Sequence, residues 1–218
     1  MEDIVKITSL GHSAFQLEES TGTKIVTDPY NDSVGQPMPK TTADAVTISH
    51  DHYDHNNLES IEGSPIVINF EGAFEVSGVH ISSVYANHDN HGGVRRGKTL
   101  VFKYRLDGVE VCHMGDIGED CNAFLSEFIM PVNVLLIPVG GKYTVDAERA
   151  KEYVDRLMPD VVIPMHYRTK NIDLGLDKVD DFIELFDDED VVYVEGNEVT
   201  FNRVDFDGER TKVYVFEN

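Results

Sequence analysis

Four side chains that commonly bind metal ions lie within six residues of one another: His50, His52, Asp54 and His55. They directly follow residues 45–49, an apolar and β-branched run that predicts a buried strand. Side chains alternate along an extended chain, so the first three would share one face, while the last could reach a second point where the chain turns. The spacing therefore predicts two metal ions, rather than one, at the end of this strand.

Two other interpretations of this segment stay open. Histidine and aspartate also occur in solvated polar loops, and a single structural zinc ion could use some of these side chains. Structural zinc sites favour cysteine ligands and a closed coordination shell, and this segment contains no cysteine. Open sites that combine histidine with carboxylate are more often catalytic, which favours an enzyme.

Further candidate ligands stand at the ends of later predicted strands: His88, His91, Asp116 and His166. The turn around Asp116 contains two glycines, which allow the backbone to turn sharply and bring the carboxylate inward. A two-metal site requires a third imidazole for the first ion, a carboxylate that contacts both ions and another imidazole for the second. Candidates occur along the chain in that order, with His88 and His91 both available as the third imidazole.

The pattern H-x-H-x-D-H after a buried strand, the Gly-Asp pair at Asp116 and the strand-end His166 resemble the metallo-β-lactamase superfamily. The resemblance implies an α/β fold of the four-layer αββα sandwich type. It implies one ion bound by His50, His52 and His88. The other ion would be bound by Asp54, His55 and His166, with Asp116 between the two. His88 is favoured over His91 because the family's third ligand follows soon after such a strand.

Two shorter strings resemble the branch of that superfamily that includes ascorbate-6-phosphate lactonase and N-acylphosphatidylethanolamine phospholipase D. Residues 10–15 contain His12, and residues 27–29 contain Asp28. His12 is a candidate catalytic residue that lines the pocket, and Asp28 could hydrogen-bond a ligand histidine and fix its tautomer. A structural role is an equal alternative for both. Asp54 is the other catalytic candidate, because it could orient the attacking water or take its proton.

Alternating and β-branched segments predict strands at residues 4–10, 14–17, 24–27, 66–70, 79–85, 100–105 and 110–113. Helices are expected at 121–130, at 145–158 with Thr144 as N-cap, and near 178–186, interleaved with strands at 134–139 and 161–165. A terminal hairpin is expected through 191–194, 199–203 and 211–216. No linker or repeat interrupts this pattern, so we expect one domain over residues 1–218.

The formal net charge of −22, from 18 Lys and Arg against 40 Asp and Glu, argues against nucleic acid as a partner. Cys112 and Cys121 form no C-x-x-C pair and are expected to be reduced, although a disulfide is an alternative. Residues 1–4 lack the features of a secretory signal, and the longest apolar run, 134–139, is too short to span a bilayer. We expect a cytoplasmic protein with a small-molecule substrate and no membrane insertion; a homo-oligomer stays open.

These features predict a metal-dependent hydrolase that uses a hydroxide held by two ions to cleave a small lactone, phosphodiester or related ester. Zinc is the first choice of metal, and manganese or iron also fit nitrogen and oxygen ligands. The alternatives are an RNA-processing nuclease of the same superfamily, with a local basic patch at 95–98, and a non-catalytic metal-binding protein. Lys142 or Tyr143 could contact the substrate, although a plain connecting loop is the simpler interpretation of residues 140–143.

Overall fold

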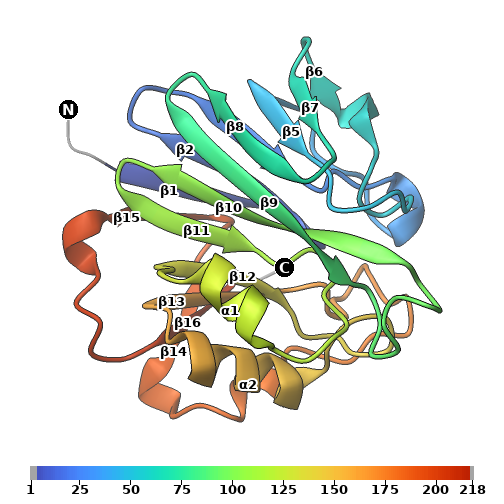
Figure 1. Cartoon of the computed structure of the whole chain (residues 1–218), viewed down its shortest axis with the longest axis vertical. Helices are drawn as coiled ribbons and strands as arrows, with labels where there is room; N and C mark the ends of the chain where they lie inside the picture. Colours follow the sequence, from blue (N-terminus) through green and yellow to red (C-terminus); the bar gives the residue numbers. More distant parts are fainter. Residues whose placement is uncertain (1–3, 217–218) are drawn as a thin grey trace.

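The computed structural model describes residues 4–216 and contains two β-sheets packed face to face (Figure 1). The first sheet has the strand order β15 (Glu198–Asn202), β1 (Ile4–Gly11), β2 (Ala14–Glu19), β3 (Lys24–Thr27), β5 (Ala45–Thr47) and β7 (Ile66–Ile68). The second has the order β14 (Val191–Val194), β16 (Lys212–Phe216), β13 (Val161–Met165), β12 (Val134–Pro138), β11 (Val109–His113), β10 (Lys98–Leu106), β9 (Val79–Asn87) and β8 (Gly72–Val76). A small third sheet pairs β4 (Thr41–Thr42) with β6 (Ile61–Glu62). Residues 1–3, on which the expectation about a secretory signal largely rests, lie outside the described residues.

The two large sheets share one apolar core. Ile7 and Leu17 of the first sheet and Phe102 and Leu136 of the second belong to a single cluster of fully buried side chains. Every residue of β12 and β13 is buried, because these central parallel strands are covered on both faces. The central strands are therefore held on both sides, and their ends provide a rigid base for the loops that follow them.

Helices cover only the outer face of the second sheet (Figure 1). They are α1 (Ala123–Ile129), α2 (Ala147–Leu157) and the short α3 (Asp180–Ile183), and buried Tyr153 and Phe182 pack with Val162 beneath them. The first sheet is covered by loops and by the 3₁₀ helices η1 (Asp32–Val34) and η2 (Leu58–Ser60). The predicted four-layer sandwich is confirmed, with an outer layer on the first sheet that contains 3₁₀ turns in place of an α-helix. No helix within residues 4–216 combines the length and apolar character needed to cross a membrane.

The predicted boundaries of the second helix were wrong at both ends. Asp146, not Thr144, is the N-cap of α2, and its carboxylate accepts a hydrogen bond from the Arg149 N–H at 3.0 Å. The Thr144 hydroxyl instead donates to the carbonyl oxygen of Val145. Met158, the last residue of the predicted helix, adopts a left-handed backbone (φ 49°) as the C-cap and is 71% exposed.

The expected terminal hairpin does not form. β15 joins the first sheet beside β1, whereas β14 and β16 pair in parallel in the second sheet. Phe201 of β15 is buried in the core between the sheets, so this strand completes the edge of the first sheet. The third predicted helix is also shorter than expected, and β8 was not predicted. Both cysteines are free, as expected.

Candidate metal centre

The candidate ligands lie at one edge of the sandwich, where strands of both sheets end. The segment from His50 to His55 follows β5 of the first sheet, whereas His88, Asp116 and His166 follow β9, β11 and β13 of the second. The Leu100 N–H donates to the Ser49 carbonyl oxygen at 2.8 Å and joins the two sheets at this edge. Ligand candidates more than 100 residues apart in sequence thus meet in one place.

The first cluster consists of three imidazoles. His50 Nε2 lies 2.8 Å from His52 Nδ1, and the His88 ring lies 4.7 Å from the His50 ring and 5.3 Å from the His52 ring, centroid to centroid. One nitrogen from each of the three lies within 4.8 Å of the others, a spacing suited to one metal ion. His88 is fully buried, whereas His91 is exposed and belongs to none of the clusters.

The second cluster consists of Asp54, His55, His166 and His12, all of which are buried. Asp54 Oδ2 lies 3.6 Å from His55 Nε2, 3.9 Å from His166 Nε2 and 3.4 Å from His12 Nε2. The His12 ring is also tilted against the His166 ring, with 4.3 Å between centroids. The sequence made His12 a candidate catalytic residue that lines the pocket. The structure places it in direct contact with Asp54, behind the residues that line the adjoining cavity.

Asp116 lies between the two clusters. Its Oδ2 atom is 3.3 Å from His88 Nε2 and 3.7 Å from His50 Nε2, on the side of the first cluster. On the side of the second, Oδ2 is 3.4 Å from His166 Nε2 and Oδ1 is 3.2 Å from His55 Nε2. One carboxylate thus faces four imidazoles at contact distance, and a bridging ligand in a two-metal site requires this geometry.

A tight turn fixes the Asp116 carboxylate. A Cβ at Gly115 would clash with Thr99 Oγ1 and would lie 2.7 Å from the Leu100 carbonyl oxygen, so only glycine fits. Thr99 Oγ1 accepts a hydrogen bond from the Asp116 N–H at 3.1 Å. His113 Nδ1 accepts a hydrogen bond from the Gly115 N–H at 3.1 Å, and His113 Nε2 donates one to the Ser13 carbonyl oxygen at 2.9 Å. This buried histidine is therefore neutral and supports the turn.

Asp28 holds both histidines at the ends of the His50–His55 segment. Its carboxylate accepts hydrogen bonds from the Ser49 N–H at 2.7 Å and the Ser49 hydroxyl at 2.6 Å, and from His55 Nδ1 at 2.8 Å. Ser49 Oγ also lies 2.9 Å from His50 Nδ1. Both Nδ1 atoms are thus engaged, and both Nε2 atoms are left facing the clusters. The sequence suggested such a role for Asp28, but it did not predict that Ser49 links Asp28 to His50.

Strained backbone occurs at three of these residues. His12, Asp28 and His166 have φ values of 53°, 38° and 53°, in the left-handed region that residues other than glycine rarely adopt. The His166 N–H also lies 3.3 Å from the His12 carbonyl oxygen and hydrogen-bonds to it, which joins two of these residues across the two sheets. The fold therefore maintains unfavourable backbone conformations at the point where the side chains must converge.

Several buried polar atoms of the clusters have no hydrogen-bond partner within the described part of the chain. They include both ring nitrogens of His88 and of His166, together with His55 Nε2 and Asp116 Oδ1. Buried polar groups are otherwise almost always satisfied, because an unpaired one costs about 1–3 kcal/mol. Nitrogen and carboxylate donors that face one another without hydrogen bonds fit divalent metal ions.

Burial and neighbouring charges shift the pKa values of the cluster. Desolvation lowers the pKa of His50 and His166 from the ordinary 6.5 to about 3. It also lowers the pKa of His88 and His113 below 6.5. Burial opposes charge on His55 too, but contacts with Asp116 and Asp28 outweigh it and raise the His55 pKa well above 6.5. Without metal, contacts with the two carboxylates therefore favour the protonated form of His55.

Protein stripped of metal by a chelator should be most stable near neutral pH. Below pH 6.5 the unfolded chain takes up protons on the four histidines that stay neutral when folded, so stability falls as the pH decreases. Above pH 6.5 the folded protein keeps the His55 proton that the unfolded chain releases, so stability also falls as the pH rises. Each proton changes the free energy of unfolding by about 1.4 kcal/mol per pH unit. Four histidines act on the acid side and one on the basic side, so stability should change more steeply below pH 6.5. Urea unfolding across this range measures both slopes, and stability that rises steadily with pH would contradict the assignment.

A cavity of about 300 Å³ opens directly onto the clusters. It is lined by His52, Tyr53, Asp54, His88, Arg96, Asp116, Tyr143 and Leu174. Tyr143 belongs to residues 140–143, for which a plain connecting loop was the simpler interpretation, and its side chain lines the cavity. No residue of the loop 30–40 is among the side chains that line this cavity. Tyr30 instead packs edge-on against His12, with 6.2 Å between ring centroids.

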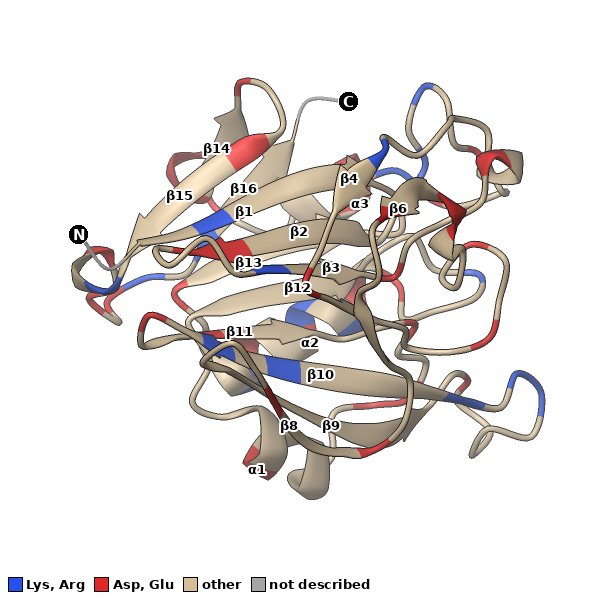
Figure 2. Ribbon diagram, turned by 90° about the horizontal axis from the view of Figure 1, so that it is seen from above, with Lys and Arg blue, Asp and Glu red and all other residues tan. Residues whose placement is uncertain are grey.

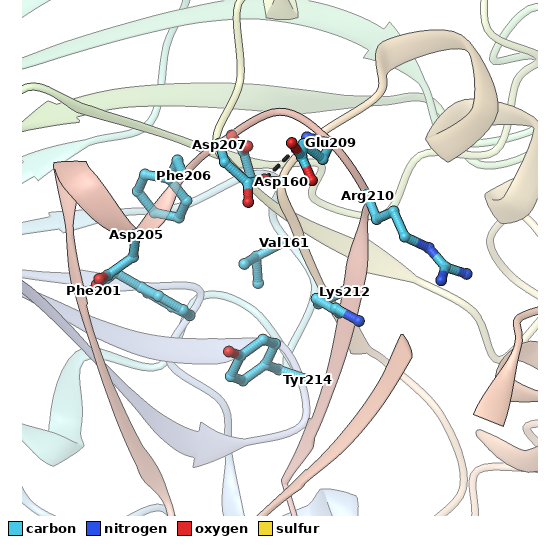
Figure 3. Close-up of a pocket in the computed structure, with 10 residues that line it drawn as sticks. All are labelled: Asp160, Val161, Phe201, Asp205, Phe206, Asp207, Glu209, Arg210, Lys212 and Tyr214. Atoms are coloured by element: carbon cyan, nitrogen blue, oxygen red, sulfur yellow. Dashed lines mark hydrogen bonds between the residues drawn. The ribbon is translucent and has the colours of Figure 1, made fainter. Parts of the chain in front are cut away.

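A second cavity, of about 330 Å³, lies beside β15 and β16 (Figure 3). Figure 3 shows the aromatic rings of Phe201, Phe206 and Tyr214 along its wall and carboxylates around it. No histidine of the described chain lines this cavity. It lacks the donor set of the two histidine and carboxylate clusters, and we assign no chemistry to it.

The comparisons with known proteins agree with this geometry. A family model described as the β-lactamase superfamily domain matches residues 6–166. The chain belongs to the metallo-β-lactamase superfamily. Like its relatives in that superfamily, it is a metal-dependent hydrolase. The more specific likeness to the lactonase and phospholipase branch stays a prediction.

Two relatives of this superfamily member are named UPF0173 metal-dependent hydrolases. The one from Pyrococcus abyssi is 32% identical over 196 residues, which cover 76% of this chain and 86% of the relative; the one from Thermococcus kodakarensis is also 32% identical. Among solved structures, a candidate zinc-dependent hydrolase of the metallo-β-lactamase superfamily from Thermotoga maritima is 41% identical, covers 98% of both chains and has a TM-score of 0.81. A metallo hydrolase from Ignicoccus hospitalis is 26% identical, with a TM-score of 0.69 over 91% of this chain and 99% of that one.

Proposed function

We propose that the protein binds two divalent metal ions and uses them to hydrolyse a small lactone, phosphodiester or related ester. The observation that carries this proposal is the position of Asp116, within 3.2–3.7 Å of histidines from both clusters. In the proposal, His50, His52 and His88 hold the first ion, and Asp54, His55 and His166 hold the second. Zinc is the first choice, supported by the naming of the Thermotoga maritima relative, and manganese or iron would suit the same donors.

The chain's own residues would bind, orient and shield the reacting groups. Two ions at these positions would lower the pKa of a water molecule and polarise the carbonyl or phosphoryl group of the substrate. Asp54, with a pKa held below its ordinary value by His12 and His55 despite burial, stays ionised and can orient that water or accept its proton. His12 contacts Asp54 Oδ2 at 3.4 Å and fixes the direction of that carboxylate.

The cavity and the overall charge favour a small substrate. A volume of about 300 Å³ suits a metabolite-sized molecule, at the lower end of the range usual for ligand pockets. The net charge of −22 would repel an RNA backbone. We therefore rank an RNA-processing nuclease below a small-molecule hydrolase, and we propose a single domain over residues 1–218 that acts in the cytoplasm.

A substrate panel tests this function. The chelated protein should be inactive, and zinc or manganese should restore hydrolysis of at least one lactone, phosphodiester or thioester in the panel. A structured RNA in the same panel, assayed across a range of salt concentrations, tests the nuclease alternative. Full metal loading without hydrolysis of any substrate would favour a non-catalytic metal-binding protein and would overturn the proposal.

A further inference from the structure

One cationic side chain borders the cavity next to the metal clusters. Arg96 lines it together with His52, His88 and Asp116. Its guanidinium carbon lies 4.3 Å from the centroid of the Tyr143 ring. Within residues 4–216, no acidic side chain forms an ion pair with Arg96, although acidic residues outnumber basic ones 40 to 18 in the sequence. This arginine is therefore available to a ligand.

The loop that carries Arg96 is built around one buried carboxylate. Asp89, which is 8% exposed, accepts backbone hydrogen bonds at 2.8–2.9 Å from the N–H groups of His91, Gly93, Arg95 and Arg96. These four bonds outweigh the effect of desolvation and lower the pKa of Asp89 to about 2. The loop is further closed by the His88 N–H, which donates to the Gly97 carbonyl oxygen at 3.1 Å. The backbone of Arg96 is thus fixed with respect to the adjacent ligand candidate His88.

Tyr143, whose ring contacts the Arg96 guanidinium, also lines the cavity. The Tyr143 ring contacts a second cation, because the Lys142 ammonium nitrogen is 4.7 Å from its centroid. Lys142 also donates to the Leu174 carbonyl oxygen at 2.8 Å, and Leu174 lines the same cavity. Cation–π contacts of this kind orient a guanidinium without neutralising its charge. Figure 2 shows blue segments on the loop between β9 and β10, which projects from the body of the molecule.

We propose that Arg96 is a specificity-determining residue that binds an anionic group, a carboxylate or a phosphate, on the small substrate. This inference rests on the proposed function, because it places the anionic group at the rim while the scissile bond lies at the metal clusters. A planar guanidinium forms paired, charge-assisted hydrogen bonds with such oxyanions. Binding of an anionic substrate to a protein with a net charge of −22 also requires a local cation, because the surrounding acidic residues would otherwise repel the substrate.

Binding of small dicarboxylates to the zinc-loaded protein tests the proposal without any need for turnover. The probes are malonate, succinate and glutarate, each compared by calorimetry with its monoamide, which has the same length but lacks the distal charge. 3-Phosphonopropionate serves as the phosphorus counterpart. For the dicarboxylate whose length fits best, affinity should be roughly 10- to 100-fold higher than for its monoamide, which is the usual contribution of a charge-assisted hydrogen bond. Arg96→Gln should abolish this preference, with zinc content unchanged.

Arg95→Gln is the matched control, because Arg95 carries the same charge in the same loop but does not line the cavity. It should keep the preference for the distal charge. No preference in the wild-type protein at any length, or a preference that persists in Arg96→Gln, would overturn the inference. Since these outcomes are measured on binding alone, they are separate from failure of hydrolysis in the substrate panel. A preference for 3-phosphonopropionate over the dicarboxylates would identify the anionic group as a phosphate.

Discussion

Replacing Asp116 with alanine should abolish hydrolysis and leave the purified protein largely without metal. The substitution removes the one carboxylate that faces both clusters and leaves four imidazoles without the negative charge that they share. Metal affinity should fall by more than the roughly 10- to 100-fold usual when a residue that supports a ligand is lost. Elemental analysis and hydrolysis of the best panel substrate, measured on the same preparation, give both quantities.

The matched control for this variant is Asp120→Ala. Asp120 lies four residues further along, on the exposed surface, where its side chain pairs with Arg149. This variant should keep full metal content and activity, because exposed ion pairs contribute little. Wild-type metal content together with unchanged turnover in Asp116→Ala would show that the bridging assignment is wrong.

Replacing Asp28 with alanine should weaken both the fold and metal binding, although Asp28 faces neither cluster directly. The substitution leaves the Ser49 N–H, the Ser49 hydroxyl and His55 Nδ1 buried without their acceptor. The free energy of unfolding should fall by about 3 kcal/mol or more, given about 1–3 kcal/mol for each unsatisfied group. Metal affinity should fall roughly 10- to 100-fold, since His55 loses the carboxylate that orients it and the Ser49 hydroxyl, which contacts His50, loses its acceptor.

Urea unfolding and competitive metal titration measure these two effects. Asp44→Ala is a suitable control, because Asp44 is an exposed carboxylate that also accepts a backbone hydrogen bond, from the Lys24 N–H at 2.8 Å. This variant should lower the free energy of unfolding by no more than about 1 kcal/mol and leave metal affinity unchanged. If Asp28→Ala loses stability but binds metal as tightly as the wild type, Asp28 supports the fold without orienting ligands.

The ligand candidates could be predicted because their signals are local. A dense run of imidazoles and carboxylate after an apolar strand, and single His or Asp residues just after later strands, can be found without knowing how the strands pair. The structure brings these residues together because the strand ends lie at one edge of the sandwich. The choice of His88 over His91 relied on the family resemblance. His88 is buried and His91 is exposed, and the choice of His88 as a metal ligand stays a prediction.

The supporting contacts could not be predicted because they join distant segments through ordinary residues. Ser49, Thr99 and His113 carry no pattern that separates them from packing residues, yet each hydrogen-bonds within the site. The same holds for β15, whose sequence suits a hairpin but whose Phe201 is buried only when the strand pairs with β1. Tertiary packing decided these cases against local preference.

Anomalous diffraction from crystals grown with zinc tests the two-metal assignment most directly. We expect two strong peaks, one on either side of Asp116. One should lie among His50, His52 and His88, and the other among Asp54, His55 and His166. A single peak, or peaks outside these clusters, would contradict it.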